Sequence, residues 1–217
     1  MPDLAKQKWR SRLEAWLLDA GASAIHEALG DRKADVIGSM SGTVVEFGPG
    51  TGSNMRYYAP GTKVIAIEPN PVMHERLHAH AEEFGVDLEV RTIYGESVDV
   101  DSESADGVVG TLLLCGVADP SAVVGEIHRV LKPGGTYFFH EHVVAPEPGR
   151  TRTMQRVVRR PHFWLFNGCR VDQDTGDILR NGPFDDIEID EIDRRSIDYI
   201  RYQIVGTARK ASAHATE

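Results

Sequence analysis

The sequence TVVEFGPGTG, residues 43–52, decides the predicted fold. Its first half is a short β-branched run, and its second half is a cluster of glycines, which is typical of a strand that ends in a tight turn before a helix. A glycine turn lets a ligand approach the backbone without meeting a Cβ atom. The segment therefore predicts a buried strand with a ligand-binding loop at its carboxyl end.

Further apolar runs follow this strand along the chain, at 63–68, 88–93, 106–113 and 136–141. Helical stretches at 71–84 and 122–131 lie between them, and two late strands are expected between Ile187 and Ala208. Strands that alternate with helices form βαβ units, whose parallel sheet is covered on both faces. The pattern predicts an α/β, Rossmann-like, doubly wound and mostly parallel seven-stranded sheet.

One domain with four parts is expected: an N-terminal helical cap (1–40), a core (43–144), a helical insertion or lid (145–185) and C-terminal strands (186–210). Apolar residues recur at helical spacing between Leu4 and Leu29. That helix is expected either to pack on the sheet or to form a lid over the ligand site. A second helix is expected from Arg150 to Phe166.

Composition limits the partners. The formal net charge is −9, which disfavours nucleic acid because phosphate binding needs a basic face. Cys115 and Cys169 are far apart in sequence and form no C-x-x-C pair, so we expect no disulfide framework and no metal site. They suit a reducing cytosol, and a cytoplasmic location is expected. The apolar run from Val108 to Val117 is too short to span a bilayer.

Two carboxylates indicate which ligand the loop binds. Glu68 ends the second strand at an expected exposed position, about twenty residues after the loop, where a carboxylate receives a ribose hydroxyl pair. The glycine spacing is G-x-G-x-G, and Ser53 stands where a dinucleotide site would have its last glycine. Glu46 would oppose a pyrophosphate but suits a ligand that carries an ammonium and a sulfonium. The sequence therefore predicts S-adenosylmethionine (SAM), with S-adenosylhomocysteine as its product.

The predicted cofactor site follows the carboxyl ends of the early strands. After the third strand, the carboxylate of Glu96 can accept a hydrogen bond from an adenine amino group. The predicted cofactor-binding residues are Glu46, Gly48, Pro49, Gly50, Thr51, Gly52, Asn54, Glu68, Pro69, Asn70, Gly95, Glu96, Ser97, Thr111, Leu112 and Leu113.

The segment His140-Glu141-His142 follows the fifth strand, at the edge where a methyl group would be presented. A histidine there can take a proton from a thiol or an amine, so His142 is a candidate base and Glu141 a second catalytic candidate. Alternatively, one of the three side chains points into the core or caps a loop. Methyl transfer is a direct displacement, so alignment and exclusion of water can supply much of the catalysis and a base is optional.

The insertion is basic over 150–160 and aromatic over 161–166. Such a segment could contact an anionic membrane surface or an acidic substrate, or it could be a solvated face whose aromatic side chains pack on the domain. Cys169 is expected to be a small buried residue near the pocket, because methyl transfer needs no protein nucleophile. The predicted substrate-site residues are His140, Trp164, Phe166 and Cys169.

Four motifs together resemble those of class I SAM-dependent methyltransferases: 46–52, Glu68-Pro69-Asn70, Gly95-Glu96 and Leu131-Lys132-Pro133-Gly134-Gly135. The stretches 52–58, 111–115, 141–143 and 167–169 are similar to those of small methyltransferase-like proteins, which include alkyl-thiol methyltransferases and bacterial phospholipid N-methyltransferase-like relatives. The resemblance implies transfer of a methyl group from SAM to a small-molecule or lipid-like acceptor, a thiol or an amine.

The membrane-associated members of that family carry a hydrophobic N-terminal anchor. This chain has Lys6, Lys8, Arg10 and Arg12 in that region, so we expect peripheral membrane contact at most. Two other functions stay open: a non-catalytic SAM-binding protein, and an NAD-dependent oxidoreductase, against which the glycine spacing counts. The acceptor pocket is expected between the N-terminal helix, the segment after His140 and the aromatic end of the insertion.

Overall fold

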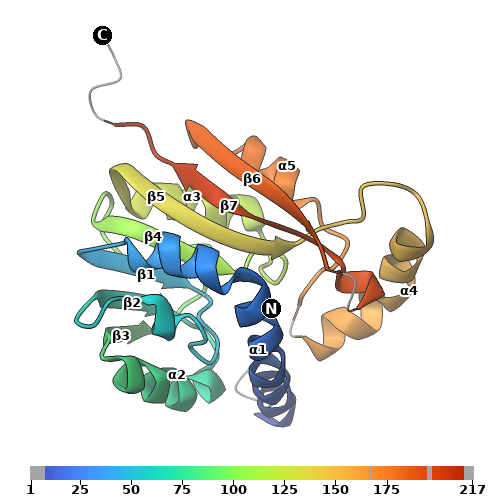
Figure 1. The fold of residues 1–217 in the computed structure, drawn as a ribbon, viewed down its shortest axis with the longest axis horizontal. Helices are drawn as coiled ribbons and strands as arrows, with labels where there is room; N and C mark the ends of the chain where they lie inside the picture. Colours follow the sequence, from blue (N-terminus) through green and yellow to red (C-terminus); the bar gives the residue numbers. More distant parts are fainter. Residues whose placement is uncertain (1–7, 167, 195–196, 213–217) are drawn as a thin grey trace.

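The computed structural model describes residues 8–166, 168–194 and 197–212. A seven-stranded sheet crosses the molecule in the order β3-β2-β1-β4-β5-β7-β6 (Figure 1). The strands are β1 Thr43–Phe47, β2 Lys63–Ile67, β3 Asp87–Arg91, β4 Ala105–Thr111, β5 Leu131–His142, β6 Asp186–Asp193 and β7 Tyr202–Arg209. Strands β1 to β5 pair in parallel, and β7 lies antiparallel between β5 and β6. The predicted Rossmann-like sheet is confirmed.

The helices are α1 Lys8–Gly38, α2 Pro71–Phe84, α3 Pro120–Val130, α4 Arg150–Leu165 and α5 Thr175–Arg180, with short 3₁₀ turns η2 Met55–Tyr57 and η3 Asp198–Ile200. Local sequence explains the ends of α2. The Asn70 side chain accepts a hydrogen bond from Val72 N–H, Pro71 occupies the first turn, and Gly85 ends the helix at φ +68°. Helix α5 was not expected from the sequence.

Alternate residues of the parallel strands face opposite sides of the sheet. Val45 and Phe47 belong to one buried cluster with residues of α3 and α5, whereas Val44 belongs to a second cluster with residues of α1 and α2. A parallel sheet that buries both faces needs apolar residues at nearly every position, which explains the continuous β-branched runs. Helices therefore cover both faces, and the carboxyl ends of the parallel strands share one edge (Figure 1).

Helix α1 continues to Gly38, beyond the expected end near Leu29. Its second half packs on the sheet, where Ile37 is fully buried, while its first half supplies Leu17 and Leu18 to the cavity described below. Ile25, His26 and Lys33 of the second half also line the cavity, so α1 packs on the sheet and borders the cavity along much of its length, and a lid role stays a prediction. In the described part of the chain, none of the helices combines the length and apolar character that crossing a membrane requires.

Candidate active site

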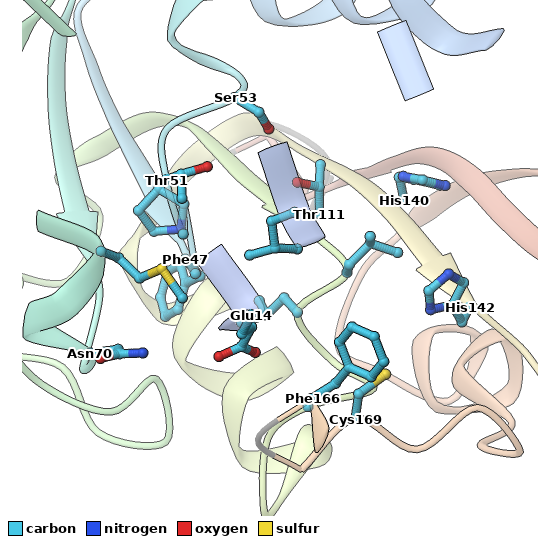
Figure 2. Close-up of a pocket in the computed structure, with 18 of the residues that line it drawn as sticks. Glu14, Phe47, Thr51, Ser53, Asn70, Thr111, His140, His142, Phe166 and Cys169 are labelled. Carbon is cyan, nitrogen blue, oxygen red and sulfur yellow. The ribbon is translucent and has the colours of Figure 1, made fainter. Parts of the chain in front are cut away.

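A cavity of about 470 Å³ opens at the edge where the parallel strands end. We call its two sides the strand half and the helix half. The strand half comprises Gly48–Thr51, Glu68–Asn70, Gly95, Glu96 and Thr111–Leu113, from the loops after β1 to β4. The helix half comprises Leu17, Leu18 and Ile25 of α1, His142, His162, Phe166, Cys169, Tyr199 and Ile200. Figure 2 shows the two halves facing each other, with Thr51 and Asn70 on one side and His142 and Phe166 on the other.

The glycine loop presents backbone to the cavity. Gly50 has φ +57°, a left-handed conformation that favours glycine. A Cβ atom on Gly50 would lie on the cavity side, 3.5 Å from Leu18 of α1. Gly52 does not line the cavity. A Cβ atom on Gly52 would come within 3.0 Å of Leu77, so this glycine lets the loop pack on α2.

Glu68 lies at the centre of the strand half. Its carboxylate accepts hydrogen bonds from the backbone N–H groups of Gly50 (3.0 Å) and Asn70 (2.8 Å). The side chain is only 6% exposed, so the expected exposed strand end is wrong. Burial raises the pKa of Glu68 to about 7. A buried carboxylate that faces a cavity can accept further hydrogen bonds from a ligand hydroxyl pair, which fits the ribose of SAM.

Glu46 does not face the cavity. It is fully buried, and its carboxylate accepts hydrogen bonds from Asn54 Nδ2 (2.8 Å) and from the Tyr58 hydroxyl (2.8 Å). Asn54 also donates to Thr111 Oγ1 (3.1 Å) and accepts from Lys33 Nζ (2.8 Å). The network joins α1, β1 and β4 beneath the loop. The expectation that Glu46 meets the positive charges of the ligand is therefore corrected: Glu46 and Asn54 support the loop from below.

Among the other predicted cofactor residues, some line the cavity and others lie outside it. Glu96 lines the cavity, and its carboxylate accepts from the N–H of Ala118 (2.9 Å), whereas Ser97 is exposed and lies outside the cavity lining. Leu112 lines the cavity with φ +54°, a conformation uncommon for a residue with a Cβ atom. The N–H of Leu112 donates to the carbonyl of His140 (2.7 Å), which ties the loop after β4 to β5.

Glu141 is not placed to act on a substrate. It is fully buried and lies outside the cavity lining. Its carboxylate accepts from the backbone N–H groups of Leu113 (3.0 Å), Leu114 (2.8 Å) and Cys115 (3.3 Å). The catalytic prediction for Glu141 is therefore corrected, and its position matches the loop-capping alternative. Burial raises the pKa of Glu141 to about 8.

The two histidines at the end of β5 differ in their surroundings. His140 is fully buried, and its Nε2 pairs with Gln203 Oε1 of β7 at 2.8 Å. Burial lowers the pKa of His140 to about 3, so this side chain is neutral at physiological pH. His142 is 9% exposed and lines the cavity, and its buried Nδ1 has no hydrogen-bond partner among the described residues. His140 Nδ1 and His162 Nε2 also line the cavity and are buried without a hydrogen-bond partner among the described residues, so His142 is one of three histidines there with an available ring nitrogen.

The aromatic residues at the end of the insertion point in two directions, some into the cavity and some to the surface. Phe166 lines the cavity and stacks on His162, with ring centroids 4.4 Å apart. Trp164 is 53% exposed and contacts Trp9 (5.8 Å between centroids) and the Arg10 guanidinium instead. The predicted substrate role of Trp164 is corrected, because successive residues of one helix face different directions. The interpretation that these aromatics pack on the domain holds for Trp164 only in part, because it contacts α1 while remaining half exposed, and Phe163 is 46% exposed.

The cysteines, far apart in sequence, meet in the fold. Cys115 follows β4 and Cys169 follows α4, and their Sγ atoms are 3.4 Å apart. Both thiols are free. Cys169 lines the cavity near His142 and Phe166 (Figure 2). Asn167, which belongs to the same predicted motif, lies outside the described residues.

Several cavity residues were not predicted from the sequence. They are Glu14, Leu18, Gly21, Ile25, His26 and Lys33 of α1, Met73, Tyr94, His162, and Ile197, Tyr199 and Ile200 near η3. The apolar periodicity of α1 points to its inward face, but no local pattern marks the segment between β6 and β7. Its place in the cavity follows from the antiparallel pairing of β7 with β5.

Comparison with known proteins agrees with this geometry. A sequence profile described as "Methyltransferase domain" matches residues 45–139. Thiol S-methyltransferase TMT1B of Rattus norvegicus is 36% identical over 157 residues, 68% of this chain and 62% of that protein. Thiol S-methyltransferase TMT1A of Homo sapiens is 33% identical over 178 residues, 77% of this chain and 70% of that protein. The chain thus spans less than two thirds of the rat relative.

Two more distant proteins are similar. Phosphatidylethanolamine N-methyltransferase of Cereibacter sphaeroides is 27% identical over 146 residues, 66% of this chain and 71% of that protein. A methyltransferase solved in complex with the Haloferax volcanii Trm112 activator superposes with a TM-score of 0.65 at 17% identity, over 91% of this chain and 97% of that one, which shows the fold alone. The predicted resemblance is confirmed, and the NAD-dependent alternative is set aside. The chain belongs to the class I SAM-dependent methyltransferase family.

Proposed function

We propose that this protein transfers a methyl group from SAM to the sulfur of a small apolar thiol. The observation that carries the proposal is the helix half of the cavity, where apolar side chains surround a histidine and a cysteine. Its relatives at 33–36% identity are thiol S-methyltransferases, which supports the same acceptor.

The strand half supplies binding and orientation. The carboxylate of Glu68 holds the ribose, and the backbone at Gly50 lets the ligand lie close to the loop. Glu96 stands at the adenine end. When bound, SAM supplies a methyl group on a sulfonium carbon, which a nucleophile can displace directly. The rest of the work is alignment of that nucleophile and exclusion of water.

The helix half suits an apolar acceptor. Leu17 and Ile25 of α1 and Phe166 at the end of α4 line it, and small-ligand sites are mostly apolar with few polar groups. A thiol must lose its proton before or as the new bond forms. His142 Nδ1 and His162 Nε2 are both buried on this half without a hydrogen-bond partner among the described residues. Our candidate for receiving that proton is His142, because it ends β5 at the edge where the parallel strands end.

The direct test is a methyl-transfer screen with isotope-labelled SAM against alkyl thiols, primary amines and phospholipid vesicles. We expect labelled thioether product from thiols and less than a tenth of that rate from amines. Labelled phospholipid without labelled thioether would contradict the proposal. Absence of any labelled product, despite SAM binding, would favour the non-catalytic alternative.

A phosphoethanolamine lipid is the second candidate acceptor, because one surface feature favours a lipid. Helix α4 exposes Arg156, Arg159 and Arg160, and near its end Trp164 is exposed beside the exposed Trp9. Arginines beside aromatic side chains suit the interface of an anionic membrane. The vesicle arm of the screen, with and without anionic lipid, separates the two acceptors.

A further inference from the structure

Three potential metal ligands lie together at the helix half of the cavity. Cys115 Sγ, Cys169 Sγ and a ring nitrogen of His142 all fall within 4.8 Å of one another. They come from three segments: the loop after β4, the loop after α4 and the end of β5. Neither the SAM site nor displacement at a sulfonium requires such a group of thiols and imidazole, so its presence calls for another explanation.

The fold holds these ligands in place. The N–H of Arg170 donates to the carbonyl of Cys115 (2.7 Å), which joins the two cysteine loops through their backbones. The Glu141 carboxylate holds the Cys115 loop through three N–H groups. Gly168, at φ +113°, lets the loops approach, because a Cβ there would lie 3.0 Å from the carbonyl of Gly116. The two thiols are therefore positioned by backbone contacts rather than by their own attraction.

The spacing fits a tetrahedral metal ion. Two thiolates bound to zinc at about 2.3 Å and a tetrahedral angle are about 3.8 Å apart. The observed Sγ–Sγ separation of 3.4 Å differs from that by a few tenths of an ångström. The buried Nδ1 of His142 has no partner among the described residues, and a buried polar atom of this kind normally has one. Binding a metal ion through Nδ1 would give this atom a partner.

We propose that Cys115, Cys169 and His142 bind a soft divalent metal ion, zinc in the first instance. Cys₂His with one open position is a known arrangement of catalytic zinc. His142 and Cys169 line the cavity whereas Cys115 lies behind them, so the open position faces the space assigned to the acceptor.

The open position would take the acceptor thiol as a thiolate, a step that rests on the proposed function. The thiol releases its proton to solvent when its sulfur binds the metal. Its sulfur then forms a bond to the methyl carbon as the carbon–sulfonium bond of SAM breaks, and the neutral thioether leaves the metal. In this arrangement the metal favours the thiolate and His142 acts as a ligand, a role that replaces the proton-accepting role proposed for His142 above.

Metal content tests the site without reference to activity. We expect the full chain, purified under reducing conditions, to hold about one zinc per chain, and cobalt replacement to give a thiolate-to-metal charge-transfer band. Cys115→Ser, Cys169→Ser and His142→Gln should each weaken metal binding at least tenfold. His26→Gln is the matched control, because His26 also lines the cavity but lies outside the group. Melting temperature and SAM affinity report whether each variant is folded.

Two results would overturn the site: no metal bound at micromolar concentrations while both thiols are reduced, or unchanged cobalt spectra in the two cysteine variants. A Cys115–Cys169 disulfide in protein that never binds metal would assign the pair to redox chemistry instead. Equal rates of thiol methylation by metal-stripped and reloaded protein would overturn the thiolate step. A loaded metal with no methylation of any thiol would contradict the proposed function and leave the site standing.

Discussion

The two halves of the cavity are built on different principles. The strand half consists of loops at the ends of paired parallel strands, held by backbone hydrogen bonds and by the Glu46–Asn54 network below them. The helix half consists of residues from α1, the end of β5, the end of α4 and the loop after it, and η3, which are far apart in the sequence. We infer that the first half sets the affinity for SAM and the second sets the affinity for the acceptor. A substitution in the strand half should therefore leave the acceptor Michaelis constant nearly unchanged, and a substitution in the helix half should leave the SAM dissociation constant nearly unchanged.

The largest expected effect lies where the halves join. Glu141→Ala would leave three buried N–H groups of the loop after β4 without their acceptor. We expect the free energy of unfolding to fall by about 3 kcal/mol. The affinities for SAM and for the acceptor should both fall as well. Glu141→Gln keeps an acceptor oxygen and should lose about 1 kcal/mol. Chemical denaturation measures both, and an Ala variant as stable as the Gln variant would show that the loop does not depend on this residue.

In the strand half, Glu68→Ala should weaken SAM binding. A hydrogen bond to a charged group contributes roughly 1.5–3 kcal/mol, which corresponds to about a 10- to 150-fold rise in the SAM dissociation constant. Titration calorimetry measures it, with the melting temperature as a control for folding. The acceptor Michaelis constant should change less than about twofold. An unchanged SAM affinity would remove Glu68 from the site.

The pKa of Glu68 gives this half a pH dependence. Because burial raises that pKa from 4.5 to about 7, the carboxyl is charged above about pH 7 and protonated below it. SAM affinity should therefore fall by up to about tenfold between about pH 8 and about pH 6. Without SAM, the raised pKa means that this group's contribution to stability declines as pH rises from about 4.5 to about 7. Glu68→Gln should abolish the pH dependence of both SAM affinity and stability. If the variant kept the wild-type pH dependence, other titrating groups would be responsible for it.

In the helix half, Phe166→Ala should raise the acceptor Michaelis constant and spare SAM. Truncating a half-buried aromatic ring costs about 1 kcal/mol, or about a fivefold change. Steady-state kinetics with a series of alkyl thiols measures it, and the effect should grow with chain length. If only the SAM dissociation constant changed, Phe166 would contact the cofactor rather than the acceptor.

Trp164→Ala gives the smallest expected effect and is the matched control for Phe166. Trp164 lies two residues away on the outer surface, against Trp9 and Arg10. Both the SAM dissociation constant and the acceptor Michaelis constant should stay within about twofold of wild type. A large rise in the acceptor constant, in protein with normal melting, would mean that the outer aromatics close over the acceptor.

The contrast between the halves also explains how far sequence alone could predict the site. Gly50 and Glu68 were predicted because a glycine turn and a strand-end carboxylate at a fixed spacing are local patterns. The sequence could not show that Glu46 turns inward to Asn54 and Tyr58, since that depends on tertiary packing. Register decides such cases, because alternate residues of a strand face opposite sides.

Contacts between distant segments were the least predictable. The meeting of Cys115 with Cys169 depends on the return of the chain after α4, and no spacing rule covers it. Trp164 and Phe166 differ only in helical phase at the end of α4, where boundaries decide which side chain turns inward. The strand topology, the cofactor and the position of the glycine loop were accessible from the sequence, whereas the composition of the helix half required the fold.

The division of the cavity is tested most directly by measuring two constants in two variants. The SAM dissociation constant and the Michaelis constant for an alkyl thiol are determined in Glu68→Ala and in Phe166→Ala, each compared with wild type. We expect the SAM constant alone to rise in the first variant and the thiol constant alone to rise in the second. If both constants rise together in both variants, the cavity does not divide into a cofactor half and an acceptor half.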